Sequence, residues 1–320
     1  MSVANIVSIS GGKDSTAMLL LALERETPNL QAVFADTGHE HAQTYEYVDY
    51  LQEATGIEIH RVRADFRMRI ARKREFIVAN WPKDGVSDAR IQEALDVLVP
   101  TGIPMLDLCL LKGRFPSTRA RFCTQELKHE PIIDQVIIPA RREHDLVLNW
   151  QGVRRQESRA RAKLLDFDID GDLPGVWNYR PILRWTADEV FAYHRQRGVR
   201  WNPLYEQGMG RVGCMPCIHS RKNELREIAR RFPDEVERVA RWERLVSRAA
   251  KRSASTWFGL KKPLIDMDTY DPDEIAPETH GIGLAVEWSK TSRGGKQYDL
   301  LAAAEDEDTP VCSSVYGLCE

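Results

Sequence analysis

The chain has 320 residues, of which 42% are hydrophobic and 29% charged, and its formal net charge is −3. This composition is typical of a soluble globular protein and excludes a disordered chain. No apolar run approaches the roughly 18 residues of a membrane span, and the first apolar segment begins too early to leave room for a signal peptide. We therefore expect a cytoplasmic protein without a membrane partner. Its six cysteines are then expected to be metal ligands or reactive thiols rather than disulfides.

The first segment with a recognisable chemistry is residues 10–15, Ser-Gly-Gly-Lys-Asp-Ser, which follow an apolar run and precede a helical pattern. This order predicts a buried strand, a tight glycine turn and the first turn of a helix. The glycines let the backbone approach a ligand closely. Free amides at the helix start, together with Lys13 and the hydroxyls of Ser10 and Ser15, would bind an anion. The Gly-x-x-x-x-Gly-Lys spacing of a Walker A motif is absent.

A second strand is expected over residues 31–35, and it ends at Asp36 and a glycine turn at Gly38. A helical pattern and a third strand follow. This alternation predicts an α/β fold with a doubly wound, mostly parallel sheet. Ligands of such sheets bind at the carboxyl ends of the strands, so Asp36 would lie near the 10–15 loop and contact the adenosine part of a nucleotide. The alternative is that Asp36 only forms the turn.

Three segments are rich in basic residues. Residues 61–74 carry seven basic residues and one acid, and residues 221–252 carry eleven basic and six acidic residues in a helical pattern. The third segment, residues 154–161, follows an expected strand over 146–150 and Gly152, and contains four arginines. Because the planar guanidinium binds oxyanions bidentately, these arginines are placed to hold phosphate or sulfate. The alternative for each segment is a solvated helical face.

A Cys-x-x-Cys pair, Cys214 and Cys217, lies near the end of the α/β region. This spacing directs two thiolates to one centre and is the usual half of a zinc or iron–sulfur site. A redox dithiol would instead be expected at a helix start in a thioredoxin-like unit, which the surrounding sequence does not indicate.

Together these segments resemble the PAPS-reductase-like branch of the PP-loop ATP pyrophosphatases, which also includes phage and prophage proteins. The matching segments occur in the family's order: 10–15, 36–38, 123–128, 152–159, 181–190, 202–205 and 213–217. The resemblance implies an adenine nucleotide alpha-hydrolase-like fold over residues 1–220. Residues 221–320 would then add basic helices and an irregular, cysteine-containing tail.

Two activities are known in this branch. Sulfonucleotide reductases reduce APS or PAPS to sulfite with a cysteine in a C-terminal Glu-Cys-Gly-Leu-His motif. That motif is missing here, which leaves Cys319 or Cys312 as loose substitutes. Proteins of the Dnd and Ssp DNA-phosphorothioation systems release pyrophosphate from ATP, and many carry an iron–sulfur cluster. The missing motif and the additional basic helices favour an ATP pyrophosphatase that acts in sulfur transfer to nucleic acid. A catalytically silent nucleotide-binding subunit is the third alternative, and the complete loop argues against it.

The resemblance also implies the cofactors and the site residues. ATP (or APS or PAPS) and Mg²⁺ would be bound by Ser10, Gly11, Gly12, Lys13, Asp14, Ser15, Asp36, Gly38, Gly152, Arg154, Arg155 and Arg159. Lys13, Asp14 and Ser15 would carry catalysis. A [4Fe–4S] cluster, with zinc as the alternative, would be held by Cys109, Cys123, Cys214 and Cys217, and Cys312 or Cys319 could replace Cys109 as the fourth ligand. The implied partners are a nucleic acid (DNA, with tRNA as the alternative), a sulfur donor such as a cysteine desulfurase, and further copies of the chain in a homo-oligomer.

Overall fold

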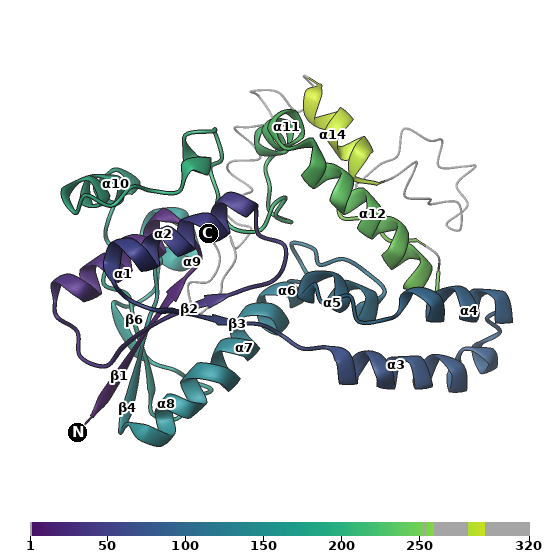
Figure 1. Cartoon of the computed structure of the whole chain (residues 1–320), viewed down its shortest axis with the longest axis horizontal. Helices are drawn as coiled ribbons and strands as arrows, with labels where there is room; N and C mark the ends of the chain where they lie inside the picture. The colour runs from purple at the N-terminus through teal and green to yellow at the C-terminus, as the bar shows by residue number, and fades with distance from the viewer. Residues whose placement is uncertain (1, 253, 259–280, 292–320) are drawn as a thin grey trace. The chain divides into compact units, whose positions relative to one another are not determined.

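The computed structural model describes residues 2–252, 254–258 and 281–291 (Figure 1). These residues form two compact units. The first holds residues 2–63 and 124–214, and the second holds residues 64–123 with the described residues from Met215 onward. The second unit therefore joins a segment from the first half of the chain to the helices beyond residue 220. Cys312 and Cys319 lie outside the described residues.

A six-stranded sheet forms the centre of the first unit, with strand order β3-β2-β1-β4-β6-β5. The strands are β1 (Val3–Ile9), β2 (Leu30–Ala35), β3 (Ile59–Val62), β4 (Leu146–Trp150), β5 (Phe167–Ile169) and β6 (Val176–Tyr179). All neighbouring strands are parallel except β5 and β6, which are antiparallel. The predicted α/β fold with a mostly parallel sheet is confirmed.

Both faces of the central strands are covered, which explains why β1 is an almost continuous apolar run. Val7 and Ile9 of β1 belong to one hydrophobic core, which also includes residues of α1 (Lys13–Glu24), α2 (Ala42–Thr55) and α10 (Ala187–Gln196). Ala4 and Ile6, which alternate with them, belong to a second core with Ile132 and Ile137. The sheet is thus a middle layer between helices.

The second core is covered by a helical segment that runs over residues 122–143 and contains two prolines. Its parts are α6 (Phe122–Thr124), η2 (Gln125–His129), α7 (Glu130–Ile132), η3 (Ile133–Ile137) and α8 (Ile138–Glu143). The parts η2 and η3 are π-helical, and each ends shortly before Pro131 or Pro139. A proline ring clashes with the carbonyl of the preceding helical turn. A wider turn before each proline accommodates the ring and lets the helix continue.

The second unit is helical in its described part. It contains α3 (Arg67–Asn80), η1 (Pro82–Asp84), α4 (Asp88–Val97), α5 (Pro104–Lys112), α11 (Lys222–Arg231), α12 (Pro233–Ala249) and α14 (Ile282–Lys290). Helix α12 packs against α4, α5, α11 and α14 (Figure 1). The buried carboxylate of Glu243 accepts hydrogen bonds from the amides of Trp257 and Ile282, at 2.7 and 2.8 Å. It therefore satisfies an amide that the start of α14 would otherwise leave without a partner.

Three short helices complete the first unit: η4 (Arg155–Glu157), α9 (Arg159–Ala162) and η5 (Pro203–Tyr205). Within residues 2–252, 254–258 and 281–291, no helix combines the length and the apolar character that crossing a membrane requires.

Candidate functional site

The 10–15 loop lies at the carboxyl end of β1, in the middle of the sheet. From β1 the chain continues to β2 on one side, and it later returns to β4 on the other side. The crevice at such a switch point is where open α/β sheets bind their ligands. Gly152 follows β4 and Asp36 follows β2, so the structure brings these two predicted segments to the same sheet edge as the loop.

The glycine turn depends on Gly11, whose φ of +81° belongs to the left-handed region. A Cβ at this position would lie only 2.6 Å from Thr44 Cγ2. The backbone also passes close to the loop at Gly152, where a Cβ would lie 3.3 Å from the backbone nitrogen of Ser15. Both glycines thus let neighbouring segments pack directly against the loop.

We expect the Gly11→Ala variant to lose about 2 kcal/mol or more of its free energy of unfolding, because the left-handed conformation alone costs roughly 1–2 kcal/mol with a Cβ. Urea unfolding measures this loss. A Gly11→Ala/Thr44→Ser double variant removes the Thr44 Cγ2 atom and should recover the part of the loss due to the clash. A Gly11→Ala variant as stable as the parent would show that the loop readily adopts another turn.

Ser10 and Ser15 stabilise the loop through hydrogen bonds within it. The amide of Ser10 donates to Ser15 Oγ at 3.2 Å, and the two hydroxyl oxygens lie 3.1 Å apart. Ser10 Oγ also accepts from the amide of Gly12 at 3.3 Å, while Ser15 Oγ donates to the carbonyl oxygen of Gly12 at 3.0 Å. The hydroxyls predicted to bind an anion therefore also hold the loop in its shape.

A buried charge cluster lies behind the loop and consists of Lys13, Asp14 and Arg154. Lys13 Nζ lies 2.7 Å from Asp14 Oδ2, and Arg154 Nε lies 2.6 Å from Asp14 Oδ1. The Asp14 side chain is fully buried, and the other two are also buried. Arg154 Nη2 also lies 3.9 Å from Glu157 Oε1, and Glu157 in turn pairs with Arg161. Three cations then face two carboxylates, which leaves one net positive charge at the start of α1, where the helix dipole adds to it. Such a place favours an anionic ligand.

The four arginines of residues 154–161 differ in their partners and in their exposure. Arg154 is bonded to Asp14 of the loop. Arg161 is buried and pairs with Glu157, whose carboxylate also accepts from the amide of Arg154 at 2.7 Å. Arg155 and Arg159 are exposed. The structure therefore assigns Arg154 to the loop and leaves Arg155 and Arg159 on the surface.

Asp36 holds the turn after β2. Its Oδ1 atom accepts from the amide of Gly38 at 2.9 Å and from the hydroxyl of Tyr45 at 2.7 Å, while Oδ2 lies 3.1 Å from Arg63 Nε. Burial and the neighbouring carboxylates of Glu40 and Asp36 raise the pKa of Tyr45, so its hydroxyl stays protonated and donates. These contacts show that Asp36 forms the turn, as in the alternative interpretation; a nucleotide contact stays a prediction.

Three side chains that the sequence did not assign to the site support the loop. Tyr205 Oη accepts from the amide of Lys13 at 3.1 Å, and Asn202 Nδ2 donates to the carbonyl oxygen of Gly11 at 3.2 Å. His194 Nε2 lies 2.8 Å from the carbonyl oxygen of Lys13. Burial lowers the pKa of His194, which favours a neutral ring that donates from Nε2. Residues 202–205 were among the matching segments, whereas His194 lies on a helix without any signal.

Cys214 lies beside a buried acid. Its Sγ donates to Glu40 Oε1 at 3.5 Å, and Thr37 Oγ1 lies 3.7 Å from the same sulfur. A β-bridge between Glu40 and Cys214 and a hydrogen bond from the amide of His41 to the carbonyl oxygen of Gly213 hold the two segments together. Sequence reasoning missed Glu40, because an isolated glutamate after a strand carries no signal.

The other three predicted ligands belong to the second unit. Cys109 is fully buried in α5, and burial, with a smaller contribution from Cys123, raises the pKa of its thiol. Cys217 Sγ accepts a hydrogen bond from the amide of His219 at 3.5 Å. In the part of the chain that the structure describes, no group of three or more histidine, cysteine or acidic side chains is arranged to hold a metal ion.

Comparisons with known proteins show the family of this chain. The family model described as Phosphoadenosine phosphosulfate reductase domain matches residues 4–220. A relative from Escherichia phage 186, described as "Uncharacterized 37.8 kDa protein in gpa 5'region", is 51% identical over all of this chain and 97% of its own length. The phosphoadenosine 5'-phosphosulfate reductase of Vibrio campbellii is 27% identical over 65% of this chain, and the match spans 63% of that enzyme.

Among solved structures, the phosphoadenylyl-sulfate (PAPS) reductase from Candida auris in its phosphate complex is similar with a TM-score of 0.41 and 18% sequence identity. The similarity covers 67% of this chain and 81% of that one. The family match includes both the 10–15 loop and the Cys-x-x-Cys pair at 214 and 217.

Proposed function

Because this chain belongs to the phosphoadenosine phosphosulfate reductase family, we propose that it binds ATP at the 10–15 loop, releases pyrophosphate and activates a nucleic-acid phosphate for sulfur transfer. The observation that carries this proposal is the buried cluster of Lys13, Asp14 and Arg154. It places a net positive charge at the start of a helix, where a polyphosphate is best stabilised. DNA is the proposed acceptor, with tRNA as the alternative.

In the proposed reaction an oxygen of the acceptor phosphate attacks the α-phosphorus of ATP. The bond between that phosphorus and the bridging oxygen to the β-phosphate breaks, and pyrophosphate leaves with the electron pair. Lys13 and the amides at the start of α1 stabilise the charge that develops on pyrophosphate. When bound with ATP at the 10–15 loop, Mg²⁺ would further neutralise this charge. Asp14 positions Lys13 and Arg154, since its carboxylate is fully buried between them.

Sulfur transfer then needs sulfur at the oxidation level of hydrosulfide. A persulfide donor such as a cysteine desulfurase, together with a thiol reductant, supplies it. The sulfur attacks the activated acceptor phosphorus, a P–S bond forms, and the P–O bond to AMP breaks. The exposed Arg155 and Arg159 are proposed to hold the acceptor's phosphates.

The proposed cluster ligands are Cys109, Cys123, Cys214 and Cys217. All four are thiols, the donors that hold iron–sulfur clusters, and Cys217 Sγ accepts an N–H hydrogen bond of the kind that tunes such clusters. Among the described residues, however, no three such side chains are gathered to hold a metal ion, so the proposal rests on the donor chemistry and not on an assembled site. Zinc is the alternative. When bound, the cluster would supply a thiophilic centre for sulfur.

The second candidate function is reduction of PAPS or APS to sulfite, which the names of the relatives favour. It requires a cysteine nucleophile, for which the sequence offers Cys312 and Cys319. The same loop would then bind the sulfonucleotide in place of ATP.

One experiment separates these functions. Anaerobically purified protein, assayed for iron, zinc and acid-labile sulfide, is incubated with MgATP alone, with MgATP and duplex DNA or tRNA, and with PAPS or APS and thioredoxin. Pyrophosphate release that nucleic acid stimulates is the expected result. Sulfite release from the sulfonucleotides would instead establish the reductase, and the absence of both products would leave a nucleotide-binding subunit.

A further inference from the structure

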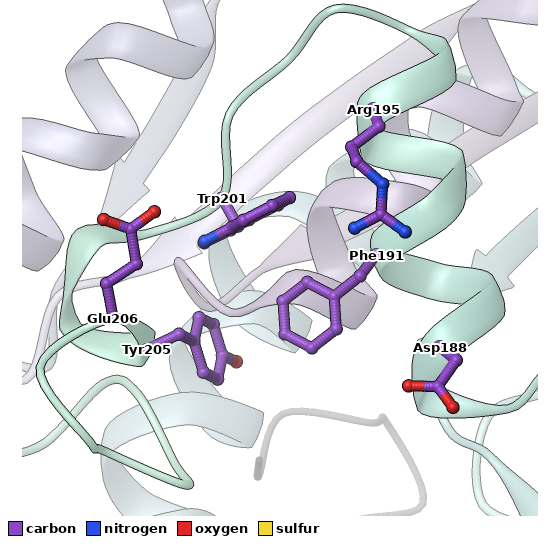
Figure 2. A pocket seen from close by; sticks show the side chains of 6 residues that line it. All are labelled: Asp188, Phe191, Arg195, Trp201, Tyr205 and Glu206. Carbon is purple, nitrogen blue, oxygen red and sulfur yellow. The ribbon is translucent and has the colours of Figure 1, made fainter.

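A pocket of about 300 Å³ lies next to the loop, between α10 and residues 201–206 (Figure 2). It is lined by Asp188, Phe191, Arg195, Trp201, Tyr205 and Glu206. All six side chains belong to the first unit. The volume is at the small end of the range of about 300–1,000 Å³ for ligand pockets. It therefore suits a single ring system rather than a dinucleotide.

Three half-buried aromatic rings give the pocket its shape. The ring of Phe191 contacts both other rings: its centroid lies 5.2 Å from that of Trp201 and 5.6 Å from that of Tyr205. Both neighbours stand nearly perpendicular to Phe191, at 79° and 89°. Aromatic rings in such an arrangement offer faces and edges to a flat ligand.

Three charged side chains surround these rings, and all three are exposed. The Arg195 guanidinium carbon lies 5.9 Å from the centre of the Trp201 ring, in a cation–π contact. Asp188 and Glu206 contribute two carboxylates. The carboxylates repel a phosphate group, and Arg195 already occupies the face of Trp201 that a cationic ligand would seek. A neutral, flat ring with amino groups that donate to carboxylates fits these charges best.

The pocket shares one wall with the loop. The hydroxyl of Tyr205 accepts the amide hydrogen bond of Lys13, and Lys13 Nζ lies 5.4 Å from the centre of the Tyr205 ring. A ligand against Tyr205 is therefore one side chain away from the group that is proposed to stabilise pyrophosphate.

We propose that this pocket binds one unpaired nucleobase of the acceptor nucleic acid, a proposal that rests on the proposed function. Base–aromatic stacking supplies the affinity. The carboxylates of Asp188 and Glu206 accept hydrogen bonds from exocyclic amino groups, as acidic side chains do from cytosine. Cytosine, adenine and guanine carry such a group and thymine does not. The pocket thus selects an amino-bearing base and places its neighbouring phosphate near the loop.

The test measures binding of fluorescein-labelled oligo-dC, oligo-dA and oligo-dT by fluorescence anisotropy, without ATP. The parent should bind oligo-dC and oligo-dA more tightly than oligo-dT.

Phe191→Leu should weaken oligo-dC binding by about tenfold, the order of one lost base stack. Asp188→Asn should reduce the preference for oligo-dC over oligo-dT. The matched control is Phe167→Leu, a phenylalanine of the same unit that is 43% exposed and outside the pocket, which should change binding less than twofold. Thermal melting of each variant is the control that checks whether it is folded.

Several outcomes would overturn the proposal. One is equal binding of oligo-dC by the parent and Phe191→Leu. A second is displacement of oligo-dC by ATP in the parent, which would assign the pocket to the adenine of the nucleotide. A third is tetramethylammonium binding that depends on Phe191, which would assign it to a cationic partner. Because binding is measured without turnover, a protein that releases no pyrophosphate but loses oligo-dC affinity in Phe191→Leu would contradict only the proposed function.

Discussion

We expect the Asp14→Ala variant to lose about 3–5 kcal/mol of its free energy of unfolding, because removing one partner of a buried ion pair leaves an uncompensated buried charge. Here two cations lose a close contact, since Lys13 Nζ and Arg154 Nε both lie within 2.7 Å of the Asp14 carboxylate, while Arg154 Nη2 keeps a longer approach of 3.9 Å to Glu157 Oε1. Both side chains are largely shielded from water, as Lys13 is 9% and Arg154 6% exposed. Urea unfolding monitored by circular dichroism measures the loss.

Two further variants test this explanation. Asp65→Ala breaks an ion pair of similar length, 2.6 Å to Arg67, in which both side chains are more than half exposed. It should cost less than about 1 kcal/mol, as exposed pairs do. An Asp14→Ala/Arg154→Met double variant removes one of the two cations that contact Asp14 and should be more stable than Asp14→Ala alone. If Asp14→Ala unfolds at the same urea concentration as the parent, the cluster is not the electrostatic centre of the loop.

The second large effect is expected on the rate of pyrophosphate release when Lys13 is replaced. Lys13→Met should reduce the rate of pyrophosphate release at saturating ATP by about 10²–10³-fold, the usual cost of removing one group that stabilises charge in the transition state. The fold should survive, because Asp14 keeps its 2.6 Å contact with Arg154 in this variant. The measurement is steady-state pyrophosphate release over a range of ATP concentrations, in the presence of the acceptor that stimulates the parent.

The matched control is Lys83→Met, which removes a lysine from the exposed η1 helix in the second unit. It should leave the rate within twofold of the parent. If Lys13→Met retains more than half of the parent rate, Lys13 does not act on the departing pyrophosphate. A change confined to KM would instead show that Lys13 binds ATP equally well in the ground state and the transition state.

Local sequence patterns were sufficient to predict the fold class and the conformation of the 10–15 loop. The strand, glycine turn and helix around residues 10–15 follow from hydrophobic periodicity and from glycine chemistry, and the structure confirms all three. The mostly parallel sheet follows from the alternation of strands and helices. The family resemblance, carried by short motifs in a set order, is confirmed by the match over residues 4–220.

The partners of charged side chains could not be predicted in the same way. Four arginines close together in sequence look equivalent, yet Arg154 bonds to Asp14, Arg161 to Glu157, and the remaining two are exposed. Asp14 and Arg154 are 140 residues apart and meet only because β1 and β4 are neighbours in the sheet. Pairings of this kind depend on strand order, which a local pattern does not contain.

By itself the sequence determined the α/β class, the loop that begins α1 and the family, because each depends on short-range periodicity or on a motif of adjacent residues. Only the tertiary structure decided which residues support that loop, since Tyr205, His194 and Asn202 reach it from nearly 200 positions away. It also decided that residues 64–123 pack with the C-terminal helices. The physical reason is that burial is shared between distant segments, and each segment alone shows only that it has an apolar face.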